Sequence, residues 1–216
     1  MPEERFDIYD ESMNHLGTAA RSEAHKHGYW HRTFHCWLLR HEDDRLLVRF
    51  QRRQLTKDTN PGCYDTTAAG HLAAGETMRD AARELEEELG VKVRFEELIP
   101  LMQVREDVSG IADGELFIDR EVSDVFGLVS NLPLSEFKLQ REEVYGIYEA
   151  ELADMLALFR GELEYVEADG AELSEAGDGL TPCVRKVLAK EFVTRDNSYY
   201  IDAMLGLRDM QNRAEK

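Results

Sequence analysis

The sequence predicts an α+β protein in which a mixed β-sheet lies between helices, an α/β/α sandwich. Strand-like segments fill the first two thirds of the chain with helical segments among them, and the remainder is mainly helical. This order argues against a regular series of βαβ units. A chain of 216 residues with 43% hydrophobic residues is long enough for one large core. We expect a single domain over residues 1–216, with a core at about 33–160 and a helical extension at about 180–213.

The strands are predicted from apolar runs bounded by turn residues. Phe6–Tyr9 alternates apolar and polar residues and precedes a short helix that begins at about Ser22. Thr33–Arg40 and Arg45–Gln51 flank the turn residues 41–44 and are expected to pair as a hairpin. Further strands are expected at Tyr64–Leu72, Leu98–Val104, Leu116–Ile118, Val122–Val129 and Val144–Ala150.

The helices are predicted where apolar residues recur at spacings of three and four. The strongest such segment, Thr77–Leu89, ends before Gly90, a residue type that commonly follows a helix. Further helices are expected at Glu151–Phe159, Pro182–Thr194 and Ser198–Met210. Between the first two of these, residues 162–178 carry seven acids and no Lys or Arg, which predicts a solvated acidic hairpin or loop.

The charge of −18 disfavours nucleic acid as a partner, because binding to phosphate backbones needs a basic surface. No apolar run of about 18 residues is present, and the N-terminal segment lacks the apolar core of a signal peptide. We therefore expect a cytoplasmic protein without a membrane partner. In the last helix, one apolar face is expected to dock on its own domain or on a second copy in a homodimer. This face consists of Tyr199, Tyr200, Met204 and Leu207.

One acidic helix is the most informative part of the sequence. Glu84, Glu87 and Glu88 are separated by three and four residues, so a helix places them on one face. Like charges this close favour either arginine partners or a divalent cation. Gly70 and Gly75 bracket a loop that leads into the helix and lets backbone atoms approach an ion or a phosphate. Oxygen ligands of this kind suit Mg²⁺, or Mn²⁺, better than zinc.

This segment resembles the Nudix box, whose pattern is G-x5-E-x7-R-E-U-x-E-E-x-G-U with U an aliphatic residue. Gly70 and Glu76 fit the first half, and residues 83–91, RELEEELGV, fit the second half. The spacer between Glu76 and Arg83 is one residue short, which would rotate Glu76 by about 100° in a regular helix. The resemblance implies a Nudix fold and a Mg²⁺-dependent hydrolase of phosphoric anhydrides.

The same resemblance implies a set of metal ligands on the helix and the loop before it. The implied ligands are Glu84, Glu87, Glu88 and the backbone carbonyl near Ala69 or Gly70. Glu87 is also assigned to the catalytic group, and Glu87 and Glu88 are expected to face water. The alternative is an ordinary amphipathic helix whose glutamates pair with Arg79 and Arg83.

The chain is also similar, from about Phe6 to Leu156, to type I isopentenyl-diphosphate isomerase. The similarity rests on HKHGYWH at 25–31, FHCW at 34–37, RRQLTK at 52–57 before PG at 61–62, and IDREV at 118–122. An isomerase would have its acid/base cysteine at Ala69, so the alkene chemistry lacks one proton-transfer group here. Because the glutamates of the box are intact, we expect an isomerase-like Nudix hydrolase.

The isomerase resemblance implies a second set of metal ligands. The counterparts of His25, His31, His71, Asp119 and Glu121 would hold a metal. Structural hydrogen bonds are the alternative for His25 and His31. For His71, a phosphate contact and a packing or capping role are both alternatives.

The reaction also needs phosphate contacts and a base. Arg53 and Lys57 correspond to residues beside the diphosphate in the isomerase, and with His71 they are expected to bind the substrate. Attack of water on phosphorus needs a carboxylate base, for which Glu121 is the first candidate and Glu143 the second. For Arg53, Glu121 and Glu143, a solvent-facing surface role is the alternative.

The expected substrate is a nucleoside diphosphate linked to another moiety, or a related organic diphosphate. Two other functions stay open: isopentenyl-diphosphate isomerase activity, and binding of a nucleotide without catalysis.

Overall fold

The computed structural model describes residues 3–112, 115–174 and 179–214. The strands are β1 (Arg5–Tyr9), β2 (His15–Ala20), β3 (His31–Glu42), β4 (Arg45–Arg53), β5 (Tyr64–Asp65), β6 (Ala68–His71), β7 (Ile99–Ala112), β8 (Glu115–Val129), β9 (Val144–Glu151), β10 (Val166–Leu173) and β11 (Leu180–Val187). The α-helices are α1 (Arg21–His27), α2 (Arg83–Leu89), α3 (Leu152–Phe159) and α4 (Asn197–Ala214). Short 3₁₀ segments lie at Asp80–Ala82, Phe95–Glu97, Leu134–Glu136 and Ala189–Glu191.

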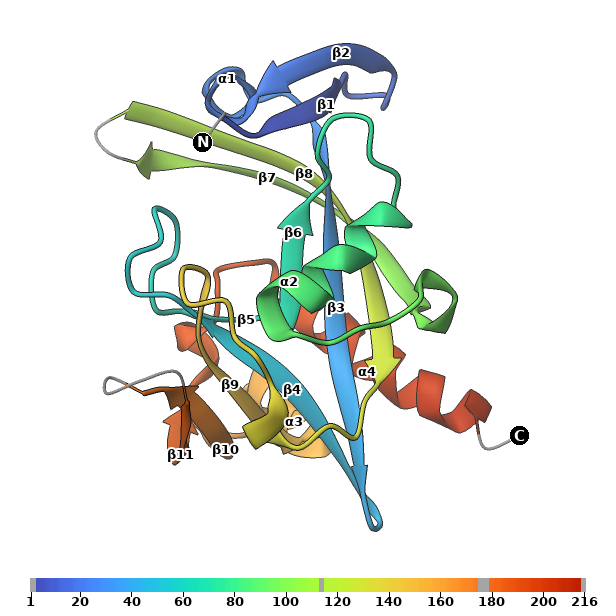
Figure 1. The fold of residues 1–216 in the computed structure, drawn as a ribbon, viewed down its shortest axis with the longest axis vertical. Coiled ribbons are helices and arrows are strands. Elements are labelled where there is room, and N and C mark those ends of the chain that lie inside the picture. Colours follow the sequence, from blue (N-terminus) through green and yellow to red (C-terminus); the bar gives the residue numbers. More distant parts are fainter. Residues whose placement is uncertain (1–2, 113–114, 175–178, 215–216) are drawn as a thin grey trace.

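One mixed sheet organises most of the described chain. Its strand order is β11-β10-β9-β4-β3-β8-β7, with β5 paired to β4 and β6 paired to β3. β3 and β8 run parallel, whereas β3 is antiparallel to both β4 and β6. The expected hairpin of Thr33–Arg40 with Arg45–Gln51 is confirmed by the β3–β4 pair. The far ends of β7 and β8 continue beyond the body of the sheet as a long hairpin (Figure 1).

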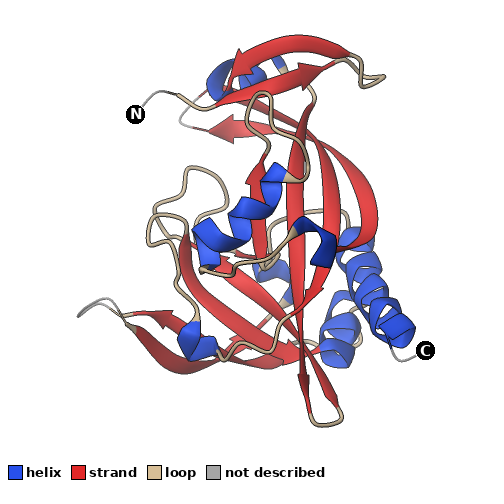
Figure 2. Cartoon of the chain, turned by 45° about the vertical axis from the view of Figure 1, so that its right-hand side comes forward, coloured by secondary structure: helices blue, strands red, loops and turns tan. Residues whose placement is uncertain are grey.

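Strand β3 is buried on both faces and divides the core in two. Phe34 and Leu38 belong to the cluster beneath α2, whereas Trp37 and Leu39 belong to the cluster beneath α3 and α4. This alternation follows from the two-residue period of a strand. Helix α2 covers one face of the sheet, and α3 and α4 cover the other (Figure 2). The predicted α+β layering is therefore confirmed.

A small N-terminal unit sits at one end of the sheet. β1 and β2 pair antiparallel, and a separate small cluster of Phe6, Ile8, Ala19 and Ala24 joins this hairpin to α1. The sequence predicts β1 and α1 but not β2. Helix α1 packs against β8 and thereby brings its residues to the end of the large sheet (Figure 1).

The expected helix Pro182–Thr194 is wrong. Residues 180–187 form strand β11, which pairs antiparallel with β10 from Leu173↔Leu180 to Val166↔Val187. The expected helical extension therefore begins only at α4. The acidic segment 162–178 is expected to be a solvated hairpin or loop, but it contains strand β10, which pairs with β11 beyond the segment. Strand β10 is not simply solvated, because Val166, Ala168 and Ala171 are buried; residues 175–178 lie outside the described chain.

Two further strand predictions differ in detail. The expected strand Tyr64–Leu72 is divided into β5 and β6, which pair with different partners. The two strands expected at Leu116–Ile118 and Val122–Val129 are one continuous strand, β8, held in register by β7.

Helix α4 packs its apolar face onto its own chain. Tyr199, Tyr200, Met204 and Leu207 are each at most 3% exposed and lie in the cluster beneath α3 and α4. Of the two options that the sequence leaves for this face, docking on its own domain is the one observed. Among the described residues, no helix is long and apolar enough to cross a membrane.

A buried histidine ties α4 to the sheet and predicts a pH-dependent stability. His35 is 2% exposed, and its Nδ1 lies 2.8 Å from the Tyr199 hydroxyl. Burial lowers the pKa of His35 to about 4, whereas an unfolded histidine titrates near pH ~6.5. Between these values the unfolded chain binds the extra proton, so this contribution to stability is lost as pH falls from 6.5 to about 4.

We expect the melting temperature of the wild type to fall more steeply across this window than that of His35→Gln, which cannot take up the proton. The exposed His27 on α1 supplies the control, because His27→Gln should leave the wild-type slope intact. Parallel curves for the wild type and His35→Gln would contradict the assignment.

Candidate functional site

The helix that carries the glutamates is shorter than the sequence predicts. Helix α2 begins at Arg83, and a turn that includes the 3₁₀ segment Asp80–Ala82 precedes it. The expected helix Thr77–Leu89 is therefore wrong in its first half. A 3₁₀ turn takes about 3.0 residues instead of about 3.6, so it accommodates the short spacer. Glu76 lies outside the helix and is not rotated as a regular helix would require.

One guanidinium, that of Arg83, gathers three carboxylates. Its Nε and Nη2 donate to Glu76 at 2.8 and 3.0 Å, and its Nη1 donates to Glu84 at 2.7 Å and Glu87 at 2.8 Å. Glu76 also accepts a 2.8 Å hydrogen bond from the backbone N–H of Ala73. The Arg83–Glu76 hydrogen bonds raise the pKa of Arg83 and lower that of Glu76. Glu76 thus anchors the glycine loop to the start of α2.

Two of the box glutamates are buried. The Glu84 side chain is 12% exposed and Glu88 is 6% exposed. Burial raises the pKa of Glu84 to about 7 and that of Glu88 well above its ordinary value, because desolvation disfavours the charged form. A bound divalent cation would offset this cost, so the buried oxygens fit the Mg²⁺ that the Nudix box implies.

Glu88 points into the protein, so the expectation that it faces water is wrong. Its Oε2 accepts hydrogen bonds from Gln51 of β4 at 3.2 Å and from the backbone N–H of Ala69 at 3.3 Å. Glu87 is half exposed, as expected. At Gly70 a Cβ atom would lie 2.2 Å from Cδ of Glu84. A side chain at position 70 would therefore displace the Glu84 carboxylate from its present place.

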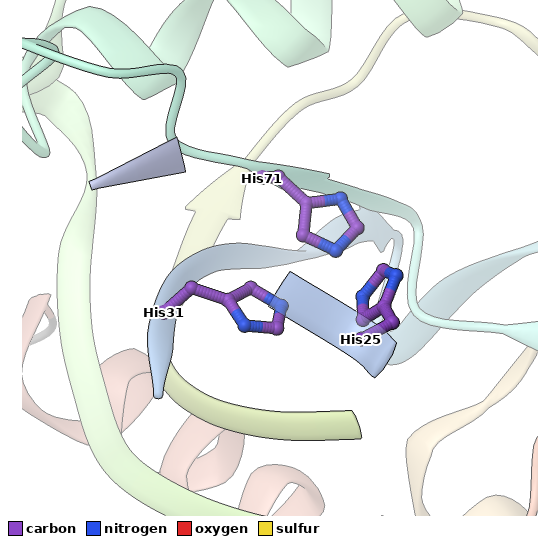
Figure 3. A group of neighbouring side chains, drawn as sticks. All are labelled: His25, His31 and His71. Carbon is purple, nitrogen blue, oxygen red and sulfur yellow. The ribbon is translucent and has the colours of Figure 1, made fainter. Parts of the chain in front are cut away.

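Three histidines from separate elements converge at the end of the sheet. His25 comes from α1, His31 from the start of β3 and His71 from the end of β6, and their rings point toward one another (Figure 3). Asp119 and Glu121 of β8 complete the group. Glu121 lies opposite His31 in the parallel β3–β8 register. We call these five residues the histidine cluster.

The histidine cluster leaves polar atoms without hydrogen bonds. Nε2 of His25 and of His31 each lie 3.5 Å from Oδ1 of Asp119. Nε2 of His71 lies 3.2 Å from Oε1 of Glu121. All three nitrogens and Asp119 Oδ1 are buried without a partner of hydrogen-bond geometry. Buried polar atoms usually have partners, and imidazole nitrogens with carboxylates are common metal ligands, so this donor set fits a metal ion.

The contacts of Nδ1 indicate which tautomers His31 and His71 adopt. Nδ1 of His31 lies 3.0 Å from the Tyr29 carbonyl, so it donates there and leaves Nε2 free as a ligand. Nδ1 of His71 lies 3.2 Å from Nη1 of Arg21, which is always a donor, so the proton of a neutral His71 is on Nε2. Burial would raise the pKa of Glu121, but its contacts with His31 and His71 hold that pKa well below its ordinary value.

In the described part of the chain, two groups of three residues could each hold a metal ion. Within each group, the ligand atoms lie within 4.8 Å of one another. These groups are His25, His31 and His71, and His31, Asp119 and Glu121. The three box glutamates do not form such a group, because Arg83 holds Glu84 and Glu87 while Gln51 and Ala69 hold Glu88. The structure thus brings together the ligands of the isomerase resemblance more closely than those of the Nudix box.

The box glutamates and three members of the histidine cluster, His71, Asp119 and Glu121, line one cavity of about 540 Å³. The expected phosphate contacts Arg53 and Lys57 line it too, but each already has a partner. Arg53 donates to the Thr59 carbonyl at 3.0 Å, which shapes the loop after β4, and Lys57 is ion-paired with Glu143. A phosphate would therefore have to compete with these contacts.

Two charged residues that line the cavity are not predicted from the sequence. Glu106 of β7 lies opposite Glu121 in the β7–β8 register, and Arg195 precedes α4 and pairs with Asp65 at 2.7 Å and Glu106 at 3.4 Å. Burial raises the pKa of Glu106 to about 7. The strand predicted at Leu98–Val104 stops before Glu106, so only the pairing of β7 with β8 reveals its place.

Comparisons with known proteins match the chain to one family. The NUDIX domain model matches residues 29–164. An uncharacterized Nudix hydrolase of Clostridium acetobutylicum is 34% identical over 210 residues, which cover 97% of this chain and 99% of that protein. Nudix hydrolase 3 of Arabidopsis thaliana is 40% identical over 154 residues, 68% of this chain but 19% of that protein.

An isomerase and a solved structure are also similar. An isopentenyl-diphosphate Delta-isomerase of Kocuria rhizophila is 36% identical over 116 residues, 52% of this chain and 63% of that protein. The crystal structure of DR0079 from Deinococcus radiodurans matches with a TM-score of 0.52 and 20% identity, over 73% of this chain and 90% of that one, and supports the fold.

The fold and the box helix define an enzyme that hydrolyses phosphoric anhydrides. The chain belongs to the Nudix family, which its match to the family model and its full-length relative establish. Members of this family work with divalent metal ions and act on small-molecule diphosphates.

The histidine cluster predicts a measurable metal site. Metal-depleted wild type should bind Mn²⁺ or Zn²⁺ in a calorimetric titration, and Glu121→Gln, which keeps the shape of the side chain, should weaken binding by at least about tenfold. His31→Ala should do the same. His27→Ala removes an exposed histidine of α1 and should bind like the wild type. Equal affinity in all four proteins would contradict the site.

Proposed function

We propose that this chain is a Mg²⁺-dependent hydrolase that cleaves the diphosphate linkage of an organic diphosphate, such as a nucleoside diphosphate linked to another moiety. The main support is that the box glutamates line one cavity together with His71, Asp119 and Glu121 of the histidine cluster, and that basic side chains line it too. Such a cavity suits a ligand with several negative charges and a reaction in which charge develops on phosphate oxygens.

Two kinds of ion suit the two ligand sets. Glu84, Glu87, Glu88 and the backbone near Gly70 offer oxygen ligands and would hold Mg²⁺. The histidine cluster offers nitrogen ligands and suits Mn²⁺ or Zn²⁺. Bound ions would neutralise phosphate charge and lower the pKa of a water molecule.

Arg21 must move if His71 is to bind an ion. A ligating Nε2 has no proton, so the ring proton would have to sit on Nδ1, where it would face the guanidinium of Arg21. Two donors cannot share a hydrogen bond. Arg21 would then turn toward the cavity that it already lines and could contact the substrate.

The guanidinium of Arg53 and the ammonium of Lys57, which also line the cavity, would orient the phosphates. Arg53 offers a planar pair of donors, which matches two phosphate oxygens, and Lys57 offers a single charge. A phosphate that bound Lys57 would break its ion pair with Glu143. Binding of substrate would therefore release the Glu143 carboxylate.

Three carboxylates are candidates for the base. In the reaction, the oxygen of water bonds to phosphorus, the bridging P–O bond breaks, and the carboxylate takes the proton from water. Glu121 and Glu143 are the candidates from the sequence, and Glu106 joins them because it lines the cavity and lies opposite Glu121 in the β7–β8 register. Glu121 suits the ligand role better, since its charge is held by two histidines.

The isomerase alternative lacks a proton-transfer group at Ala69, which lies on β6 at the cavity. Release of dimethylallyl diphosphate from isopentenyl diphosphate would support it. A protein that only binds nucleotides would be stabilised by diphosphates in the presence of Mg²⁺ without releasing any product.

Two neighbouring glutamates test the proposal. Glu87→Gln should lower the metal-dependent release of phosphate or nucleotide by about two orders of magnitude, with little change in stability because Glu87 is half exposed. Glu86 lies on the same helix, is similarly exposed and pairs with Lys92, so Glu86→Gln is the matched control. Equal turnover in both variants would rule out the Nudix-box chemistry.

The base is tested by the variants Glu106→Gln, Glu121→Gln and Glu143→Gln. The variant that lacks the base should lose about 10²–10⁴-fold in kcat while it still binds substrate. Glu121→Gln should also weaken metal binding, which separates a ligand from a base. Retention of kcat in Glu106→Gln and Glu143→Gln would leave Glu121 as the base.

A further inference from the structure

The β7–β8 hairpin forms part of the cavity wall and extends beyond Glu106 and Glu121. Along one face of the hairpin, the cross-strand pairs are Glu106↔Glu121, then Val108↔Asp119, then Gly110↔Phe117. Each of these six residues lines the cavity. Four residues of strand span about 14 Å, so Phe117 lies roughly that far along the wall from Glu121.

The outer end of this wall is apolar. Val108 is 51% exposed, Phe117 is half-buried, and Gly110 has no side chain. We call these three residues the apolar shelf. Exposed apolar surface in a concave site is a common feature of pockets that bind organic groups.

The glycine of the shelf leaves an open space. In a sheet, an aromatic residue opposite a glycine often covers the bare backbone. Here a Cβ built on Gly110 meets nothing within 4 Å, so the ring of Phe117 does not cover it. Phe117 leans instead toward His25, with ring centroids 4.5 Å apart. A glycine within a strand often marks a place where a ligand approaches the backbone.

The size of the cavity agrees with a ligand that reaches the shelf. Its volume is about 540 Å³. This lies within the range of about 300–1,000 Å³ typical of sites that hold whole organic ligands.

We infer that the substrate carries, next to its diphosphate, an organic group with an apolar face that packs against Phe117 and the backbone of Gly110. This inference rests on the proposed function, because it assumes that the phosphates bind between the box glutamates and the histidine cluster. A nucleobase and a hydrocarbon chain both offer such a face. A diphosphate with a small or purely polar substituent would leave the shelf uncovered.

Three probes distinguish these ligands: methyl diphosphate, ADP and geranyl diphosphate. The wild type should favour ADP or geranyl diphosphate over methyl diphosphate by about tenfold or more in kcat/KM, as burial of an apolar group predicts. Whichever of the two is favoured identifies the source of the apolar face. Similar kcat/KM for all three would overturn the inference.

Gly110→Val fills the open space without a clash and with a residue that favours strands. This variant should reduce the ratio of kcat/KM for the favoured probe to kcat/KM for methyl diphosphate at least fivefold, as should Phe117→Ala. The matched control is Asp107→Val, which puts the same side chain on strand β7 three residues away, at a position outside the residues that line the cavity. An unchanged ratio in Gly110→Val would also overturn the inference.

A binding measurement separates this inference from the proposed function. Affinities for the same three probes are measured by calorimetry, with Mg²⁺, in Glu87→Gln and in Glu87→Gln combined with Gly110→Val. If the wild type hydrolyses none of the probes and no nucleoside diphosphate linked to another moiety, the proposed function fails, but the order of affinities still decides the inference. Equal affinities for the three probes in Glu87→Gln would reject the shelf as a binding surface.

Discussion

The parallel pairing of β3 with β8 determines where the candidate functional groups lie. Its register sets His31 beside Glu121, and the continuation of β8 past the sheet carries Asp119 and Phe117 along the cavity. The same strand β3 pairs with β6, which brings His71 to the cluster and lays Gly70 against Glu84. Because β3 is buried on both faces, a shift of one residue would exchange its two apolar sets, so the register is strongly fixed.

Charged groups are distributed unevenly around the cavity. On one side of the cavity, Arg83 partly neutralises the carboxylates of the box helix, while Glu84 and Glu88 remain buried at a cost that a cation would offset. In the histidine cluster, the buried Nε2 atoms of His25, His31 and His71 and Oδ1 of Asp119 have no hydrogen-bond partner. A fold selected for stability alone would pair these groups or replace them. Their arrangement is understandable if the cavity is built to hold metal ions and phosphate.

The sequence predicts local features well and long-range features poorly. Residues 83–91 identify the family, because the spacing of charges on a helix is a local property, and the layered α+β fold follows from the order of strands and helices. The sequence predicts a helix at Pro182–Thr194, yet pairing with β10 makes residues 180–187 a strand, since strand formation depends on neighbouring strands. Glu106 was missed for the same reason: its place is set by a partner strand rather than by its own surroundings in the sequence.

The proposed function places metal ions at two sites, one on the box helix and one at the histidine cluster. The most direct test is a crystal structure of the protein grown with Mn²⁺ and methylenediphosphonate, with anomalous scattering used to locate manganese. The proposed function predicts one anomalous peak among Nε2 of His25, His31 and His71. It predicts another beside Glu84 and Glu88, with the diphosphonate between the two. A diphosphonate bound elsewhere, with no peak at either site, would contradict it.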